Sequence, residues 1–318
     1  MNECSVEPPI RVGLIGLGRQ GLFHLERWSD GHAVQVVAAC DIDPAALSLA
    51  ATLCGRVEFE VDSLLADRDI DAILLAVPTF ERARIGRQVL AAGKHLAFAE
   101  PPVATTVGEA AGLFDVAETS ERRIVVWTPW RDASDFQEAY SVAQSRLAGA
   151  IRFLRFERWS AASTTGIDRL ADGDRSFPRS VVYVLDQLIA LAGTEPLQVF
   201  SRQAGGSVTA TVAFAENLTA AVTLRMRAAV NLDLGWAFDG ERGGYAAGRR
   251  WVRTDDGEIY DVPIEQAAAP TLEGELCTVL AGSSPVVGRT ESLRLIALLD
   301  AMERSLRSGE VATVTLTP

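Results

Sequence analysis

The sequence contains few of the side chains that most often transfer protons in enzymes. Of its 30 basic residues only Lys94 is a lysine, and its three histidines are His24, His32 and His95. General acids and bases are drawn mainly from histidine, carboxylates, lysine, tyrosine and cysteine. If the protein is an enzyme, the inventory of possible proton donors is therefore short.

Metal-ligand spacing, long apolar segments and an excess of positive charge are also missing. The four cysteines, at positions 4, 40, 54 and 277, are scattered, so we expect reduced thiols, a cytoplasmic location and no metal site. The net charge of −12 argues against nucleic acid and anionic membranes as partners. No apolar run reaches the roughly 18 residues of a membrane span. Residues 1–9 lack the basic and apolar parts of a signal peptide, and we expect a disordered tail there.

The chain does contain a full pattern for dinucleotide binding near its start. The apolar run from Val12 to Leu17 predicts a buried strand. The glycines that follow have the G-x-G-x-x-G spacing: Gly16, Gly18 and Gly21. A helical pattern comes next, and then a second strand that ends at Asp41, about 20 residues after the last glycine. The glycine spacing is a weak indication by itself, but between a strand and a helix it is specific.

Each part of this pattern has a physical role. Gly16 permits a tight turn, Gly18 lets a pyrophosphate approach the backbone, and Gly21 lets the helix pack closely on the strand. The helix N-terminus then offers free N–H groups to the phosphates. Asp41 can accept hydrogen bonds from both ribose hydroxyls, and its charge, with that of Asp43, would repel a 2′-phosphate. The sequence therefore predicts NAD(H) as cofactor in preference to NADP(H).

Strand and helix patterns alternate with short links through the first part of the chain. This alternation predicts a doubly wound parallel sheet, a Rossmann domain over residues 10–130. Residues 131–318 instead show a long alternating strand, several further strands and closing helices. We expect an α+β domain there, with a mixed, mostly antiparallel sheet that binds substrate and mediates oligomerisation. Because such a sheet leaves one face open, a homodimer or homotetramer through that face is the expected assembly.

Four blocks of sequence resemble a known family. They are VGLIGLGRQGLFH at 12–24, AILLAVPTFERARIGRQVLAAGKH at 72–95, the glutamate–proline segment at 100–102, and VLDQLIALAGTEP at 184–196. The chain resembles the glucose–fructose oxidoreductase and inositol dehydrogenase (Gfo/Idh/MocA) family over nearly its full length. The resemblance implies a Rossmann domain, a mixed-sheet domain, NAD(P) binding and homo-oligomers.

The resemblance and the strand ends together define an expected cofactor site, because ligands of open parallel sheets lie beyond the carboxyl ends of the strands. Its residues are Gly16, Gly18, Arg19, Gln20, Gly21, Asp41, Ile42, Val77, Pro78, Thr79, Glu100 and Pro101.

The catalytic signature of the family is broken in this sequence. The family's E-K-P lysine, which bonds the reacting hydroxyl, aligns with Pro101. Lys94 cannot replace it, because it precedes the strand that Pro101 follows and so lies roughly 20 Å away. The family's acid/base histidine aligns with Tyr183, and the aspartate before it aligns with Arg179. Only Asp186, the last acid of the motif, is kept.

The residues at these three helical positions are predicted to share one face of a helix. Arg179, Tyr183 and Asp186 are spaced i, i+4 and i+7 on an otherwise apolar segment. The stripe is either a solvated or locally hydrogen-bonded group, or a catalytic set that faces the nicotinamide. Members of the family that are similar to dihydrodiol dehydrogenase also carry a tyrosine in the histidine position. A tyrosine is a better acid than base unless a cation such as Arg179 lowers its pKa.

Three further residues are candidates for binding substrate. Trp130 and Arg131 follow the last strand of the predicted Rossmann domain, and Trp159 ends the long alternating strand. Arg131 either binds an anionic group of the substrate or pairs with Asp132 or Asp135.

Three functions remain open at this point. The first is an NAD-dependent oxidoreductase acting on a small molecule, namely a sugar, cyclitol or related hydroxyl or carbonyl compound. The second is a reductase of a conjugated substrate, because biliverdin reductases are similar in fold and also lack the lysine. The third is a cofactor-binding sensor or accessory protein that has lost catalysis.

Overall fold

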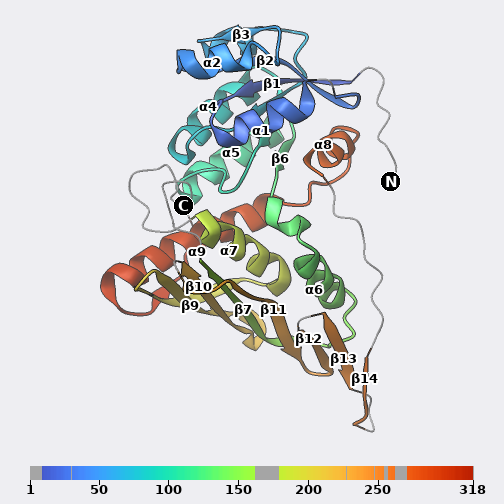
Figure 1. Cartoon of the computed structure of the whole chain (residues 1–318), viewed down its shortest axis with the longest axis vertical. Coiled ribbons are helices and arrows are strands. Elements are labelled where there is room, and N and C mark those ends of the chain that lie inside the picture. Colours follow the sequence, from blue (N-terminus) through green and yellow to red (C-terminus); the bar gives the residue numbers. More distant parts are fainter. Residues whose placement is uncertain are drawn as a thin grey trace. The chain divides into compact units, whose positions relative to one another are not determined.

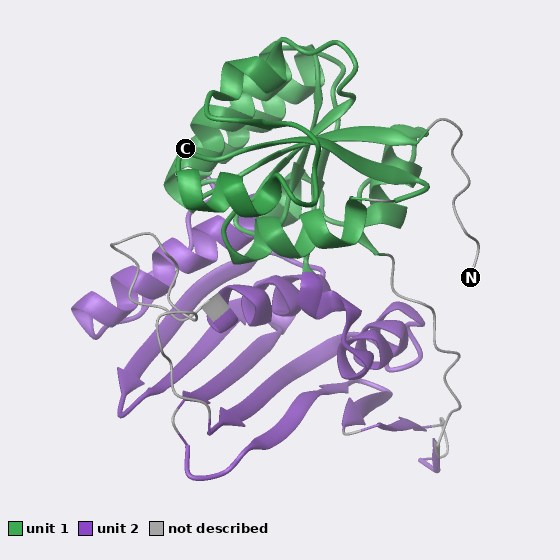
Figure 2. Cartoon of the chain, turned by 45° about the horizontal axis from the view of Figure 1, so that its top comes forward, with its two compact units in different colours: residues 1–128, 270–292, 318 green, residues 129–269, 293–317 purple. Residues whose placement is uncertain are grey.

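The computed structural model describes residues 9–29, 31–161, 179–226, 228–246, 248–253, 257–261 and 271–317, with only the backbone of Arg179 and Asp261. The chain forms two compact units: residues 1–128, 270–292 and 318, and residues 129–269 and 293–317 (Figure 2). The predicted division at residue 130 did not anticipate that 270–292 belong to the first unit. Of the predicted disordered tail, residues 1–8 lie outside the described part of the chain.

The first unit contains a six-stranded parallel sheet with helices packed against it (Figure 1). The strands are β1 (Ile10–Ile15), β2 (Val34–Cys40), β3 (Val57–Glu58), β4 (Ala72–Leu75), β5 (His95–Phe98) and β6 (Ile124–Val126). The helices are α1 (Arg19–Trp28), α2 (Pro44–Ala50), α3 (Val61–Leu65), α4 (Thr79–Ala91), α5 (Val107–Thr119) and α8 (Leu272–Leu280).

The strand order places the ligand crevice of this sheet. The order is β3-β2-β1-β4-β5-β6, so the chain reverses direction across the sheet between β1 and β4. In an open α/β sheet, ligands bind outside the carboxyl ends of the strands at such a switch point. Both strands are apolar and buried over nearly their whole length, as expected where helices cover both faces of a sheet.

Helix α8 explains why a segment close to the end of the sequence returns to the first unit. Its side chains Leu272, Leu276, Cys277 and Val279 are at most 3% exposed and belong to the same core as β1 and β2. An apolar helical face of this kind is stable only against another apolar surface. The sequence pattern predicts the helix, but it does not say which sheet the helix covers.

The second unit contains a nine-stranded mixed sheet. Its strands are β7 (Ile151–Ser160), β8 (Pro196–Ala204), β9 (Ser207–Phe214), β10 (Thr219–Met226), β11 (Leu232–Gly240), β12 (Gly243–Ala246), β13 (Arg249–Arg253), β14 (Ile259–Asp261) and β15 (Ala312–Thr313). Their order is β14-β13-β12-β11-β7-β10-β9-β8-β15, and only the β7–β10 pair is parallel. The predicted fold class is therefore confirmed for both units.

The helices of the second unit lie on one face of this sheet (Figure 1). They are the short 3₁₀ helix η1 (Pro129–Asp132), α6 (Ser134–Gln144), α7 (Arg179–Ala192) and most of α9 (Arg289–Ser308); a further 3₁₀ turn, η2 (Ala215–Asn217), joins β9 to β10. Alternate residues of β9, from Val208 to Phe214, are buried while those between them are more exposed. A period of two is what a strand covered on one side requires.

Candidate functional site

The glycine-rich turn joins β1 to α1 at the switch point of the first sheet. Gly16 has a φ of +96°, and a Cβ atom there would lie 2.7 Å from the carbonyl oxygen of Ala76. A Cβ on Gly21 would lie 1.9 Å from the carbonyl oxygen of Gly16. Gly18 is different, because a Cβ there would meet nothing within 4 Å. Gly16 and Gly21 are thus fixed by the protein itself, whereas Gly18 faces open space.

The start of α1 provides the donors for an anion. Gly18 is the N-cap of the helix, and no side chain caps it. The first N–H groups of a helix have no partner within the helix, and the helix dipole adds a partial positive charge at this end. Open space beside Gly18 and an uncapped helix end are the features that a pyrophosphate needs, so the turn fits the phosphates of a dinucleotide.

Asp41 lies directly after β2, beside the turn. One carboxylate oxygen accepts the backbone N–H of Leu17 at 2.5 Å, and the other accepts that of Asp43 at 2.8 Å. An ionised carboxylate has about four acceptor positions, so these two bonds fix its orientation and leave acceptor capacity for ribose hydroxyls. The next residue, Ile42, is 89% exposed, an unusual state for an isoleucine.

The carboxyl ends of β4 and β5 carry the remaining predicted cofactor residues. Pro78 is the N-cap of α4, and Thr79, its first residue, is 4% exposed. Glu100 is also 4% exposed, and its carboxylate forms an ion pair at 2.9 Å with Arg82 of α4. Pro101 is buried. Sequence reasoning missed Arg82, although an arginine among the apolar positions of the α4 pattern was a signal.

Lys94 and His95 are both held by hydrogen bonds to the backbone of the first unit. Lys94 donates through Nζ to the carbonyls of Asp67 and Ile70, the latter at 2.9 Å, and burial lowers its pKa. His95 accepts the N–H of Arg123 through Nδ1 at 3.0 Å, and burial lowers its pKa as well. Lys94 directly precedes β5 and His95 is its first residue, so both lie at the end of the sheet opposite the switch point, as the sequence predicts.

His24 lies on α1 and is 1% exposed. Its ring centroid lies 4.8 to 5.2 Å from those of Phe23, Trp28 and Trp127. Burial, with a smaller contribution from the charge of Arg27, lowers the pKa of His24 to about 4. The imidazole is therefore neutral at physiological pH and part of an aromatic core.

Four predicted site residues of the second unit meet where η1 packs on α7. Tyr183 of α7 is 6% exposed, and its ring lies 5.3 Å from that of Trp130, centroid to centroid. Asp186 pairs with Arg131 through two parallel bonds, at 2.8 Å from Nε and 2.9 Å from a terminal nitrogen. Asp186 is a partner for Arg131 that the sequence analysis did not name. The side chain of Arg179 lies outside the described part of the structure.

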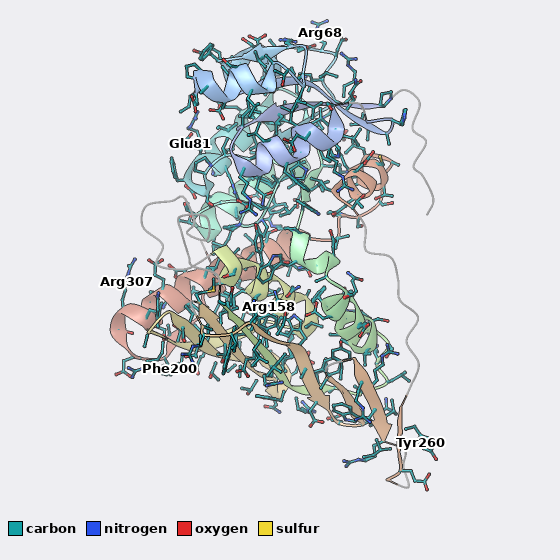
Figure 3. The ribbon with its side chains drawn as sticks, viewed as in Figure 1. Arg68, Glu81, Arg158, Phe200, Tyr260 and Arg307 are labelled. Carbon is teal, nitrogen blue, oxygen red and sulfur yellow. The ribbon has the colours of Figure 1, made fainter. Side chains whose placement is uncertain are left out.

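Three further side chains lie close to Trp130 or to its partners and were not predicted from the sequence. Gln187 of α7 donates to the carbonyl of Trp130 and accepts the indole N–H of Trp236 at 2.9 Å. The guanidinium carbon of Arg158, in β7, lies 4.9 Å from the ring centroid of Trp130 (Figure 3). The ring of Trp130 thus contacts both Tyr183 and a cation. The signal for Arg158 was present, because strand alternation puts it on the same face as the buried Leu154 and Phe156.

Trp159 lies elsewhere. Since neighbouring residues of a strand point to opposite faces, Trp159 and Arg158 lie on different faces of the sheet. The indole of Trp159 donates to Glu157, two residues away on its own face, at 3.0 Å, and Arg225 lies over its ring. Trp159 therefore lies on the face of the sheet opposite to α7 and Tyr183, and its role in binding substrate stays a prediction.

Two absences hold for the described residues. They contain no group of three or more His, Cys, Asp or Glu side chains placed to hold a metal ion. Nor do they include a helix that is both long and apolar enough to cross a bilayer.

Comparison with known proteins gives these features a family. A doubly wound sheet with a glycine-rich turn, and an acid after the second strand, define the first unit as a dinucleotide-binding Rossmann unit. Residues 10–128 match the model described as "Oxidoreductase family, NAD-binding Rossmann fold". The first unit therefore matches the NAD-binding part of the Gfo/Idh/MocA oxidoreductases, the family that the motifs of the chain predict.

The relatives differ in how much of the chain they share. The inositol 2-dehydrogenase of Rhizobium meliloti (strain 1021) is 22% identical over 321 residues, 93% of this chain and 97% of that protein. A glycosyl hydrolase family 109 protein of Shewanella amazonensis is 30% identical over 128 residues, 37% of this chain. That match spans only 28% of the hydrolase, so what is shared with it is one segment.

Solved structures share the fold over nearly the whole chain. An NAD-binding protein from Listeria innocua has a TM-score of 0.80 at 20% identity, covering 97% of both chains. The scyllo-inositol dehydrogenase from Lactobacillus casei, with bound NAD(H) and scyllo-inositol, has a TM-score of 0.76 at 16% identity, covering 96% of this chain and 99% of its own.

Proposed function

We propose that this protein is an NAD-dependent oxidoreductase that acts on a hydroxyl or carbonyl group of a sugar, cyclitol or related compound. The observation that carries the proposal is the Asp41 carboxylate, fixed by two backbone N–H groups beside an uncapped glycine turn. The inositol 2-dehydrogenase relative supports a polyhydroxylated substrate. NAD, when bound, supplies the acceptor or donor of hydride.

The residues of the first unit give the cofactor its place and its preference. The N–H groups of Arg19, Gln20 and Gly21 would bind the pyrophosphate, since they begin an uncapped helix. Asp41 would accept the ribose hydroxyls and repel a 2′-phosphate, so NAD(H) is preferred over NADP(H). The exposed side chain of Ile42 would cover one face of the adenine. Val77 to Thr79, with Glu100 and Pro101, would line the nicotinamide side.

In the second unit, Tyr183 is the proposed proton donor and acceptor. Its hydroxyl would protonate a carbonyl oxygen during reduction, or take the proton of an alcohol during oxidation. Arg179, one helical turn before it, would favour the phenolate by its charge. Trp130 would contact the apolar face of a sugar or cyclitol ring, held in place by Tyr183 and by the cation of Arg158.

Arg131 and Asp186 then have a supporting role. Both are buried, at 5% and 3% exposure, and their two parallel hydrogen bonds join η1 to α7. Arg–carboxylate pairs of this geometry give orientation as well as energy. The pair would therefore fix Trp130 relative to Tyr183, rather than bind the substrate directly.

We also propose that the protein is a cytoplasmic homodimer or homotetramer. The sheet face opposite the helices carries Phe153, which is 42% exposed, and Phe200 (Figure 3). A sheet face with apolar side chains gains stability when a second copy covers it.

A substrate screen tests the catalytic part of this proposal. Purified protein with NAD⁺ is offered a panel of inositols, sugars and sugar acids, and absorbance of NADH is followed. We expect turnover of at least one polyol, and a loss of about 100-fold or more in kcat for Tyr183→Phe. Full turnover by Tyr183→Phe on the same substrate would show that Tyr183 is not the acid/base.

A second candidate is a cofactor-binding protein without catalysis. Pro101 occupies the position of the family lysine, and Tyr183 is only 6% exposed, which favours this candidate. It predicts tight NADH binding and no hydride transfer across the same panel. Turnover of any member of the panel would exclude it.

A further inference from the structure

A buried arginine joins the loops at the carboxyl ends of β4 and β5. Arg82 is in the first turn of α4, and it is 3% exposed although its side chain carries a permanent charge. A charge without water must be balanced by a partner and by hydrogen bonds, or the fold is destabilised by several kcal/mol. The partners of Arg82 therefore show what the position requires.

Four hydrogen bonds leave the guanidinium in different directions. Nε donates to the carbonyl of Val77 at 3.0 Å. One terminal nitrogen donates to the carbonyls of Glu100 and Pro102, at 2.8 and 2.7 Å. The other donates to the carboxylate of Glu100 at 2.9 Å. The two carbonyls of the second set flank Pro101, the position at which the family has its lysine.

The same network reaches the glycine-rich turn. The second carboxylate oxygen of Glu100 accepts the amide of Gln20 at 3.5 Å, and Gln20 is the second residue of α1. The turn after β1, the loop after β4 and the loop after β5 are thus connected through one ion pair. These are the three strand ends that line the ligand crevice of the sheet.

We propose that Arg82 is a positioning residue for the nicotinamide half of the cofactor site. This inference rests on the proposed function, in which the loops after β4 and β5 hold the nicotinamide. Arg82 fixes the backbone of both loops through its four hydrogen bonds. Because its guanidinium is buried and already bonded, it does not contact the ligand itself. Pro101 has no backbone N–H group, so it cannot donate a hydrogen bond that would hold the loop in place. The loop is held instead through the carbonyls of Glu100 and Pro102, which accept hydrogen bonds from Arg82.

A lysine could not do the same work. Its ammonium is a compact charge with three donors, whereas Arg82 makes four bonds with a planar, rigid group. Arg82→Lys keeps the buried charge but loses the planar guanidinium with its several donors, and Arg82→Gln loses both the charge and the guanidinium. Together the two substitutions separate the charge from the geometry.

The test compares two ligands that differ only by the nicotinamide. Affinities for NADH and for ADP-ribose are measured by calorimetry on the purified full chain. Since ADP-ribose uses only Asp41 and the glycine turn, we expect Arg82→Gln to weaken NADH about tenfold or more and ADP-ribose less than about twofold, the order expected for losing bonds to a charged group. Arg82→Lys should fall between wild type and Arg82→Gln.

The outcomes are distinguishable. A wild-type protein that binds neither ligand would refute the proposed function. If wild type binds NADH and the variants weaken both ligands alike, or neither, Arg82 serves only the fold and the proposal is overturned. Where Arg82→Gln does not fold, Arg82→Lys and Glu100→Gln carry the same comparison.

The matched control is on the same helix. Arg84 is 62% exposed, and within the described residues its guanidinium donates to two side chains of α4, Glu81 at 2.5 Å and Gln88 at 3.4 Å. Arg84→Gln should leave both affinities unchanged, so a loss at Arg82 cannot be assigned to removing any arginine from α4.

Discussion

The candidate sites of the two units are built in different ways. In the first unit the binding features are backbone features: a turn, a helix end and one carboxylate, all within about 30 residues of sequence. In the second, side chains from η1, β7, β11 and α7 are packed against each other, and two of the family's catalytic positions carry Arg179 and Tyr183. The candidate cofactor site therefore depends mostly on residues close together in sequence, whereas the side chains of the second unit depend on neighbours distant in sequence.

We expect the largest effects from substitutions in the glycine turn of the first unit. Gly21→Ala would place a Cβ where the Gly16 carbonyl now lies, and we expect it to destabilise the first unit by about 3 kcal/mol and to abolish NADH binding. Gly18→Ala meets no protein atom, so it should fold normally and still lose NADH affinity. Thermal unfolding and NADH titration of both variants check this. A Gly18→Ala protein with wild-type affinity would contradict the phosphate site.

The second unit should respond in stability rather than in cofactor binding. Asp186→Asn removes the carboxylate partner of the buried Arg131, and we expect a loss of about 3 kcal/mol in urea unfolding with NADH affinity unchanged. The control is Asp300→Asn on α9, whose pair with Arg304 is exposed, and which should lose about 0.5 kcal/mol or less. Equal losses for the two variants would mean that the buried pair contributes no more than a surface pair.

His24 should make the free energy of unfolding of the first unit depend on pH. Its pKa of about 4 in the folded state lies below 6.5, the value for an unfolded histidine, so the unfolded state binds the proton first. Stability is fully present above pH 6.5 and falls as the pH drops toward 4, by about 3 kcal/mol in all. Unfolding free energies of wild type and His24→Phe are compared between pH 7.5 and 4.5.

This slope should become smaller in His24→Phe, in which the contribution of the half-buried His95 remains, and should be unchanged in a control, His32→Gln, because His32 is exposed. Parallel curves for wild type and His24→Phe would contradict the buried neutral imidazole.

The parts of the molecule that sequence predicts are those with local causes. The strand, glycine turn and helix from Val12 to Trp28 follow from neighbouring residues, and the structure keeps the predicted order. The partner of Arg131 was not predictable in the same way, since Asp186 lies 55 residues further along. Arg82 was missed because spacing alone does not reveal a charge buried under two loops.

Two placements could not be predicted from the sequence, for similar reasons. Alternation in β7 predicts that Arg158 and Trp159 lie on opposite faces, but not which face the helices cover. Likewise α8 has an apolar face that either sheet could accept, and only packing decides that it completes the core of the first unit. Local pattern gives the elements, and contacts distant in sequence give their partners.

A paired titration tests the central claim most directly. NADH and NADPH are titrated into wild type and into Asp41→Ser, with binding followed by nicotinamide fluorescence. We predict that wild type binds NADH at least about tenfold more tightly than NADPH, and that Asp41→Ser reduces or reverses this ratio, because the carboxylate that repels a 2′-phosphate is gone. Equal affinity of wild type for the two cofactors, or no binding of either, would contradict the account.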